Sequence, residues 1–275
     1  MGTGYAARMY NILIAVGVGL LGYGLGAFAA GWLAGFIPGL LALGGAWFYL
    51  ARRTGKKVEA VFQRAMATLQ GGKIDEARTI LLSGMPLGKW QILVGAQIHS
   101  QIGALDYLQA VGHTVQKQPT QAKERFATAR GNLERAWSRD WRAKTTLAVI
   151  HHREGRPDDA VKVLEAATGP GASETLFWAV YTYVLNEAKR REEALKVVGR
   201  GLAANKENKS LRAIQDALAN KKRPDFKVLG DAWFQLFPED IPREQLMQMH
   251  GINPQQAPRP QKTFPQPRGF GPPRR

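Results

Sequence analysis

The chain contains no cysteine, and 43 consecutive residues, Met9–Ala51, carry no charge. The lack of cysteine excludes disulfide bonds, thiol catalysis and cysteine metal sites. Also missing are the glycine-rich phosphate loop, the Gly-x-Ser-x-Gly nucleophile elbow and the His-Glu-x-x-His zinc motif. These absences argue against an enzyme, so we expect no catalytic residue, no cofactor and no metal site.

The uncharged run is long enough to cross a bilayer twice. One helix of that length would measure about 65 Å, whereas the core of a bilayer is about 30 Å thick. We therefore predict a transmembrane hairpin over residues 10–50, with spans Tyr10–Ala29 and Trp32–Leu50. Neither span contains Asp, Glu, Lys, Arg or His, which pumps and transporters need for an ion or proton path.

Basic residues predict the orientation of this hairpin. Arg8 lies in the N-terminal segment 1–9, and the juxtamembrane segment 51–57 contains Arg52, Arg53, Lys56 and Lys57. Because Lys and Arg are retained on the cytoplasmic side, we expect a multi-pass protein of a bacterial inner (cytoplasmic) membrane with both termini in the cytoplasm. The four basic residues also suit anionic lipid headgroups.

Two other topologies stay open from the sequence alone. Ala27-Phe28-Ala29 is an acceptable cleavage motif for a signal peptide, although cleavage there would leave an apolar span at the new N-terminus. A wedge that enters and leaves the same leaflet also fits the apolar run.

The predicted spans contain two small-residue steps, Gly22/Gly26 and Gly35/Gly39. Steps of this kind let helix backbones approach closely in lipid. The simplest interpretation is that the two spans pack on each other within one hairpin. The alternative is a face for self-association, and hence a homo-oligomer, or for docking against another membrane protein.

A turn-plus-helix pattern recurs after the hairpin. Gly155–Leu164 matches Arg190–Val198, and the pivotal residues Ala160 and Ala194 are 34 residues apart. Gly72–Leu81 carries the same signature, with an acidic pair before a small residue. Helical periodicity dominates throughout this region, so internal repetition of helix pairs is predicted.

This pattern resembles the tetratricopeptide repeat family, whose 34-residue units each fold into two packed helices. The residues that match the family pattern are Ala65, Gly72, Ala77, Leu81, Leu147, Ala148, Gly155, Ala160, Leu164, Ala167, Trp178, Ala194 and Val198. The chain departs from it at Lys189, where glycine is usual, and lacks the proline that ends each unit. The resemblance covers about 110 residues and implies an α-solenoid over residues 58–220. A generic array of helical hairpins is the alternative.

Small side chains are expected where paired helices cross, because larger ones would hold the helices apart. The predicted crossings are Ala65/Ala77, Ala148/Ala160 and Thr182/Ala194. Between the first and third units we predict a longer pair, Leu87–Val115 and Thr120–Ser138. A capping helix, Ser210–Asn220, would cover the last apolar face.

The resemblance also implies which residues line the concave surface of the solenoid. They are Arg142, Thr145, Val149, His152, Arg153, Leu176, Ala179, Tyr183 and Asn186. This mixed basic and apolar surface suits an extended peptide or a helix of a protein partner with some acidic character.

Two further segments follow the predicted repeats. The segment 221–253 includes Phe226–Phe237, in which seven of twelve residues are large and apolar. We expect it to fold back onto the last helices, with docking on a partner as the alternative. The tail, residues 254–275, has seven prolines, five basic residues and no acid, so we predict disorder with polyproline character. A nucleic-acid role would rest on charge alone and is not expected.

Together these features predict an all-α protein: a two-helix transmembrane hairpin, a solenoid resembling tetratricopeptide repeats, and a disordered tail. We expect a membrane-anchored adaptor or scaffold that binds protein partners. The alternative is a non-catalytic subunit or assembly factor of a membrane complex, in which the glycine-rich hairpin is the main interaction element.

Overall fold

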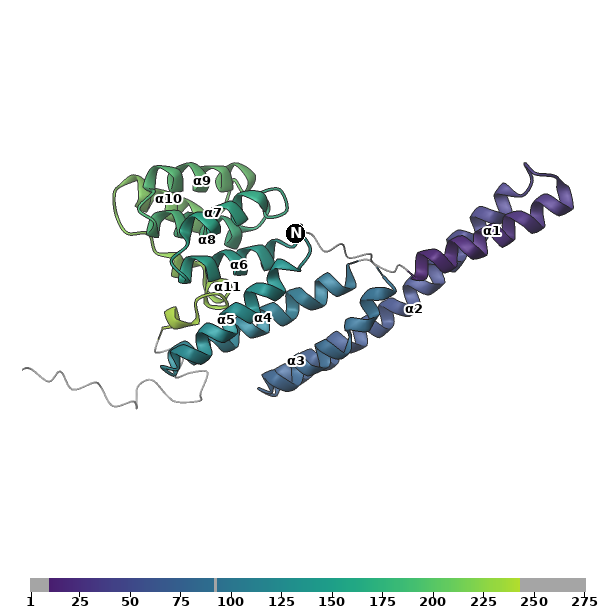
Figure 1. The fold of residues 1–275 in the computed structure, drawn as a ribbon. Coiled ribbons are helices and arrows are strands. Elements are labelled where there is room, and N and C mark those ends of the chain that lie inside the picture. Colours follow the sequence, from purple (N-terminus) through teal and green to yellow (C-terminus); the bar gives the residue numbers. More distant parts are fainter. Residues whose placement is uncertain (1–9, 92, 243–275) are drawn as a thin grey trace, which may run out of the picture.

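The computed structural model describes residues 10–91 and 93–242, and every regular element in these two ranges is helical. The all-α prediction is therefore confirmed for these residues. The predicted N-terminal segment 1–9, the end of segment 221–253 and the tail lie outside the described residues. α1 (Tyr10–Ala30) and α2 (Phe36–Gln70) lie side by side and project from one end of the molecule (Figure 1).

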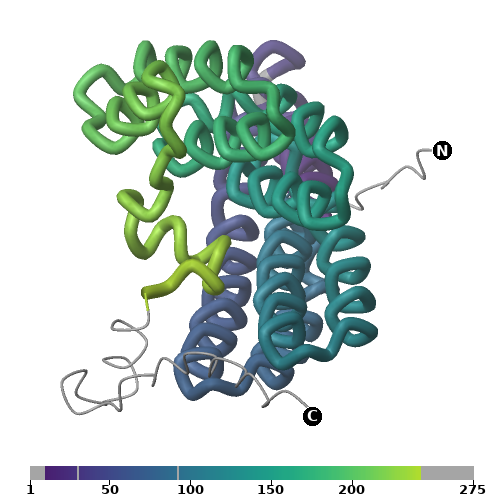
Figure 2. Tube along the Cα trace, turned by 90° about the vertical axis from the view of Figure 1, so that its left-hand side faces the viewer, coloured from purple at the N-terminus to yellow at the C-terminus, as the bar shows by residue number. Residues whose placement is uncertain are grey.

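The remaining helices form successive pairs that stack along the molecule (Figures 1 and 2). The second half of α2 packs on α3 (Ile74–Ser83), and the next pairs are α4 (Val94–Val115) with α5 (Pro119–Glu134), α6 (Trp141–Arg153) with α7 (Pro157–Ala166), and α8 (Thr175–Glu187) with α9 (Arg191–Ala204). α10 (Lys209–Ala219) packs on α8 and α9. Because α4, α6, α8 and α10 each contact the next in that series, they form one continuous layer.

Short helical turns complete the described chain. The 3-10 helix η1 (Met85–Lys89) precedes α4, and η2 (Phe226–Leu229), α11 (Asp231–Phe234) and η3 (Pro238–Asp240) follow α10. The segment Phe226–Asp240, here named the C-terminal segment, returns across the layer formed by α4, α6 and α8 (Figure 2).

Each turn inside a helix pair contains one residue with a left-handed backbone conformation. The φ angles are +76° at Gly72, +59° at Lys117, +73° at Gly155 and +61° at Lys189. After Lys189, the N–H of Arg190 donates back to the carbonyl of Leu185 at 2.9 Å, which closes the end of α8. Lys189 departs from the family pattern in sequence but adopts the same backbone conformation as the glycines, at a cost of about 1–2 kcal/mol.

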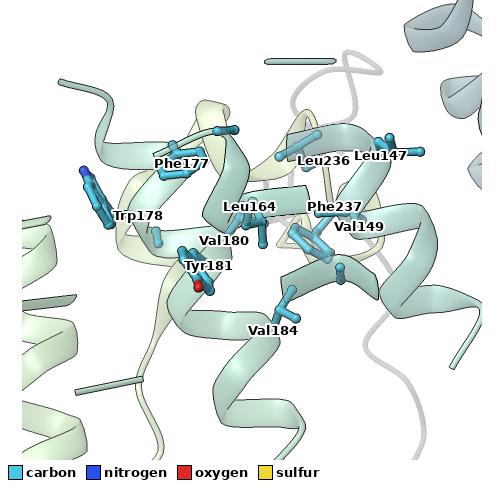
Figure 3. Packing of buried hydrophobic residues seen from close by; sticks show 14 of the residues in the cluster. Leu147, Val149, Leu164, Phe177, Trp178, Val180, Tyr181, Val184, Leu236 and Phe237 are labelled. Atoms are coloured by element: carbon cyan, nitrogen blue, oxygen red, sulfur yellow. The ribbon is translucent and has the colours of Figure 1, made fainter. Parts of the chain in front are cut away.

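Small residues occupy the predicted helix crossings. Ala77, Ala148, Ala160, Thr182 and Ala194 are fully buried at 0% exposure, and Ala65 is 4% exposed. Figure 3 shows the packing around these helices, with Leu164 and Val184 in the same core. Close approach of the helices therefore depends on side chains no larger than threonine at these positions.

Several element boundaries differ from those predicted. The second helix of the hairpin begins at Phe36 rather than Trp32, because residues 31–35 form the turn and Gly31 has a φ of +91°. α4 begins at Val94 rather than Leu87, because η1 is a separate turn. α5 ends at Glu134 rather than Ser138. The predicted capping helix corresponds to α10 within one residue at each end.

Candidate interaction surfaces

The outside of the hairpin is apolar on all sides. Leu20, Leu25 and Leu41 are 66%, 74% and 71% exposed, and large apolar side chains cover both helices. Among the described residues, the segment Tyr10–Ala29 is the one helix long and apolar enough to cross a membrane, with a mean hydropathy of 2.1. The apolar part of α2, Phe36–Ala51, is shorter, so the second span stays a prediction.

The predicted glycine steps face each other inside the hairpin. A Cβ atom built on Gly22 would lie 2.8 Å from the Ala42 Cβ, and one on Gly26 would lie 2.5 Å from the Pro38 Cγ. In the turn, directly before α2, a Cβ on Gly35 would lie 2.5 Å from the Tyr23 carbonyl oxygen. A Cβ on Gly39 would lie 2.9 Å from the Tyr23 Cβ. These glycines therefore serve the contact between α1 and α2.

The base of the hairpin joins the stack without a linker. Helix α2 continues from its apolar half through the predicted membrane-surface residues to Gln70, and Arg52, Arg53, Lys56 and Lys57 are all exposed on it. Thr54 lies on the opposite side of α2, where its Oγ1 accepts a hydrogen bond from the Asn11 Nδ2 at 3.0 Å. The four basic side chains therefore form an exposed basic cluster, here named the basic collar, where the apolar half of α2 ends.

The C-terminal segment supplies an aromatic cluster to the layer of α4, α6 and α8. The ring of Tyr183 on α8 lies 5.3 Å from Phe226, 5.2 Å from Trp233 and 5.0 Å from Phe237. Trp233 stacks on Phe226 and on Phe237. Figure 3 shows Leu236 and Phe237 beside Val149 of α6. The segment is thus part of the main core.

Polar contacts hold the same segment at its end. Arg153 of α6 pairs with Glu239, and its Nε donates to the Tyr107 hydroxyl at 3.2 Å. That hydroxyl donates in turn to the carbonyl oxygen of Leu236. Burial raises the pKa of Tyr107, so its hydroxyl keeps the proton that it donates. The C-terminal segment therefore contacts α4, α6 and α8 rather than only the last helices.

The predicted concave-face residues fall into three groups. Thr145, Val149 and Ala179 are buried. Arg153 and Tyr183 contact the C-terminal segment directly. The remaining residues are exposed or half-buried: Arg142, His152, Leu176 and Asn186. The layer that the resemblance assigned to a partner is therefore covered by the protein's own chain at its centre, and open positions lie at its margins.

Two adjacent histidines on α6, His151 and His152, both have a lowered pKa. Burial lowers the pKa of His152, whose ring lies 5.3 Å from Tyr183, and Arg153 lowers it further against the opposing effect of Glu187. Burial and then Arg156 lower the pKa of His151. Both groups therefore favour the neutral imidazole in the folded chain.

We predict that folding stability falls as the pH drops below 6.5, the usual pKa of histidine. The unfolded chain binds protons there, whereas folded His151 and His152 resist protonation until the pH passes below their lowered pKa. Urea unfolding at pH 7.5 and at 5.5 measures the loss, and changing both residues to Gln should flatten it. If the double variant loses as much stability between pH 7.5 and pH 5.5 as the wild type, the two histidines are not the cause of the loss. Carboxylates such as Glu165, whose pKa is lowered, become protonated at lower pH than this range.

A second surface lies between α3, α4 and α5. A polar hollow of about 710 Å³ is lined there by Asp75, Arg78, Gln109 and Arg125, among others. Two of these lining residues, Arg78 and Arg125, pair with Asp106, which is fully buried at 0% exposure and accepts from the Arg78 Nε at 2.8 Å. This hollow was not predicted from the sequence, because its ion pair joins residues on different helices.

Comparisons with known proteins do not assign a family. No family model matches the chain, and no curated protein matches it. In the described ranges no group of three or more His, Asp or Glu side chains is placed to hold a metal ion. The chain's own surfaces are therefore the basis for a functional proposal.

Proposed function

We propose that this protein is a membrane-anchored adaptor that binds a protein partner at the cytoplasmic face of a bacterial inner membrane and carries out no catalysis. The single observation that carries the proposal is the continuity of α2. One helix contains both the apolar half of the hairpin and the first helix of the stack. The stack is thereby held at a fixed distance from the membrane surface.

Two features support a stack of the tetratricopeptide type. The left-handed turn residues Gly155 and Lys189 are 34 residues apart, which is the length of one family unit. The helices α4, α6 and α8 form one layer, as the first helices of successive units do in solenoids. In such proteins this layer is the binding surface, so we place the partner on it.

The chemistry of the layer suggests the chemistry of the partner. The C-terminal segment presents aromatic rings to Tyr183 and the carboxylate of Glu239 to Arg153. At the open margin, Arg142 is exposed at the start of α6, with its guanidinium carbon 5.0 Å from the centre of the Trp141 ring. An extended peptide or helix with acidic and apolar side chains would complement this margin.

Photocrosslinking in native membranes tests this proposal. Arg142 is replaced by benzoylphenylalanine in the full-length protein, and Lys162, an exposed residue on α7, is replaced in a matched variant. The proposal predicts one discrete protein adduct from position 142 and none from position 162. Equal labelling of many proteins from both positions, or no adduct from either, would contradict a binding role for this layer.

A second candidate function has its own observation. The hairpin carries glycines that face outward, since a Cβ on Gly17 or Gly24 would meet nothing within 4 Å. A shallow apolar groove between α1 and α2, lined by Val16, Tyr23 and Leu40 among others, has a volume of about 290 Å³. A subunit of a membrane complex would use these surfaces for its main contact.

Leucine substitutions at Gly22 and Gly24 are expected to differ in their effect on the packing of the hairpin. Gly22→Leu should unpack the hairpin, because its Cβ would meet the Ala42 Cβ at 2.8 Å and the Pro38 carbonyl oxygen at 3.0 Å. Gly24→Leu should leave the hairpin folded. Thermal stability of the two variants in detergent measures the difference, and equal stability would contradict the observed packing. Loss of a membrane complex in Gly24→Leu alone would favour the subunit role over the adaptor role.

A further inference from the structure

The turn before α4 contacts the start of α1, next to the point where the apolar half of α2 ends. The N–H of Asn11, at the start of α1, donates to the carbonyl oxygen of Trp90 at 3.4 Å. The same Asn11 donates through its Nδ2 to Thr54, next to the basic collar of α2. Trp90, Asn11 and Thr54 are therefore at one height, and in a membrane-inserted hairpin that height is the interface.

The side chains at this turn have the chemistry of an interfacial contact. Trp90 is 40% exposed and Leu93 is 36% exposed, and Lys89 is exposed beside them. The Trp90 ring packs edge-to-face on Tyr10, with ring centres 5.2 Å apart. Tryptophan and tyrosine are enriched at the level of lipid headgroups, where an apolar ring and a polar N–H or O–H are both satisfied.

The turn also contains a residue in an unfavourable backbone conformation. Leu93 has a φ of +72°, in the left-handed region that a leucine adopts at a cost of about 1–2 kcal/mol. On the inner side of the turn, Gly84 fits closely, since a Cβ there would lie 3.0 Å from Val61 and 3.2 Å from Ile98. Strain of this kind persists where the surrounding structure fixes the conformation, and it concentrates at functional positions.

We propose that Lys89, Trp90 and Leu93 form a further membrane contact, which lies in the headgroup region of the cytoplasmic leaflet. Trp90 and Leu93 enter the boundary between headgroups and acyl chains, and the Lys89 ammonium meets anionic phosphate groups. The inference rests on the proposed insertion of the hairpin. It adds to that proposal that the stack is fixed to the bilayer by the turn before α4 as well as by α2, which sets its rotation about the α2 axis.

Site-directed spin labelling tests this contact. Because the chain has no cysteine, a spin label attaches only at the cysteine that is introduced. Single cysteines are introduced at Lys89, at Leu41 on the hairpin and at Val115, which is 66% exposed at the opposite end of α4. Full-length protein is placed in vesicles of equal parts phosphatidylcholine and phosphatidylglycerol. Accessibility of each label to oxygen and to a water-soluble nickel complex reports its depth.

The proposal predicts a graded result. The label of Leu41→Cys should lie in the acyl chains, that of Val115→Cys in water, and that of Lys89→Cys at intermediate depth. If Lys89→Cys matches Val115→Cys while Leu41→Cys is in lipid, the interfacial contact is overturned and the anchoring stands. If Lys89→Cys is shielded from both reagents, the turn contacts protein instead, which also overturns the contact. If Leu41→Cys is in water, the proposed anchoring fails, and this inference fails with it.

Discussion

Replacing Trp233 with alanine is expected to lower the free energy of unfolding by about 3–5 kcal/mol, the usual cost of removing a buried large aromatic side chain. Trp233 is 1% exposed, and its ring centre lies 4.1 Å from that of Phe237. Its Nε1 also donates to Asp240 at 2.9 Å. The substitution removes the centre of the aromatic cluster, so the C-terminal segment should also detach from α8.

Urea unfolding and limited proteolysis together measure this effect. The matched control is Val228→Ala in the same segment, because Val228 is 47% exposed and its loss should change stability by less than about 0.5 kcal/mol. Faster cleavage within the C-terminal segment of Trp233→Ala, with the helix pairs still protected, would show release of the segment. Unchanged cleavage together with unchanged stability would contradict the observed packing.

Replacing Asp106 with alanine is expected to cost about 3–5 kcal/mol, because a buried ion pair would lose one member. The Asp106 carboxylate is completely buried and accepts from Arg78, from Asn132 at 3.1 Å and from Arg125 at 3.5 Å. Its loss leaves two guanidinium groups without their shared partner. Asp106→Asn should cost less, because the amide oxygen still accepts one of these hydrogen bonds.

Asp75→Ala is the matched control for that prediction. Its carboxylate lies 3.6 Å from the same Arg125, but its side chain is 78% exposed, so the pair should contribute less than about 1 kcal/mol. Urea unfolding of both variants gives the comparison. Equal losses at Asp75 and Asp106 would show that burial does not determine the strength of these pairs.

The sequence was sufficient for the features that depend on local pattern. Helical periodicity predicted an all-α chain, and small residues such as Ala160 and Ala194 marked positions that the structure buries completely. The apolar segment after α10 also packs within the chain, as expected, and buries Phe226, Trp233, Leu236 and Phe237. These predictions succeed because neighbouring residues determine the helix, its buried face and its turn.

Features that depend on distant residues could not be predicted. The Arg78–Asp106 pair joins residues 28 apart on α3 and α4, and no local pattern distinguishes Asp106 from a surface acid. The left-handed conformation of Leu93 likewise has no signal in its residue type. It lies directly before α4, which begins at Val94 rather than at the predicted Leu87. The contact of Trp90 with Asn11 depends on how the hairpin meets the stack.

The candidate binding layer shows the same limit. The resemblance to tetratricopeptide repeats named residues of α6 and α8, and several of them do share one layer. It could not show that Arg153 and Tyr183 are engaged by the C-terminal segment. That contact spans more than 50 residues of sequence from Tyr183 to Phe237, so it follows from the folded chain alone.

The central claim is that the hairpin crosses the membrane and holds the stack in the cytoplasm. Labelling of single cysteines in spheroplasts with an impermeant maleimide tests it most directly, using Trp32→Cys in the turn of the hairpin and Lys162→Cys on α7. The account predicts that Trp32→Cys is labelled from outside in intact spheroplasts, and that Lys162→Cys is labelled only after lysis. Labelling of both positions only after lysis would contradict a spanning hairpin and would leave a wedge in the cytoplasmic leaflet, or no insertion.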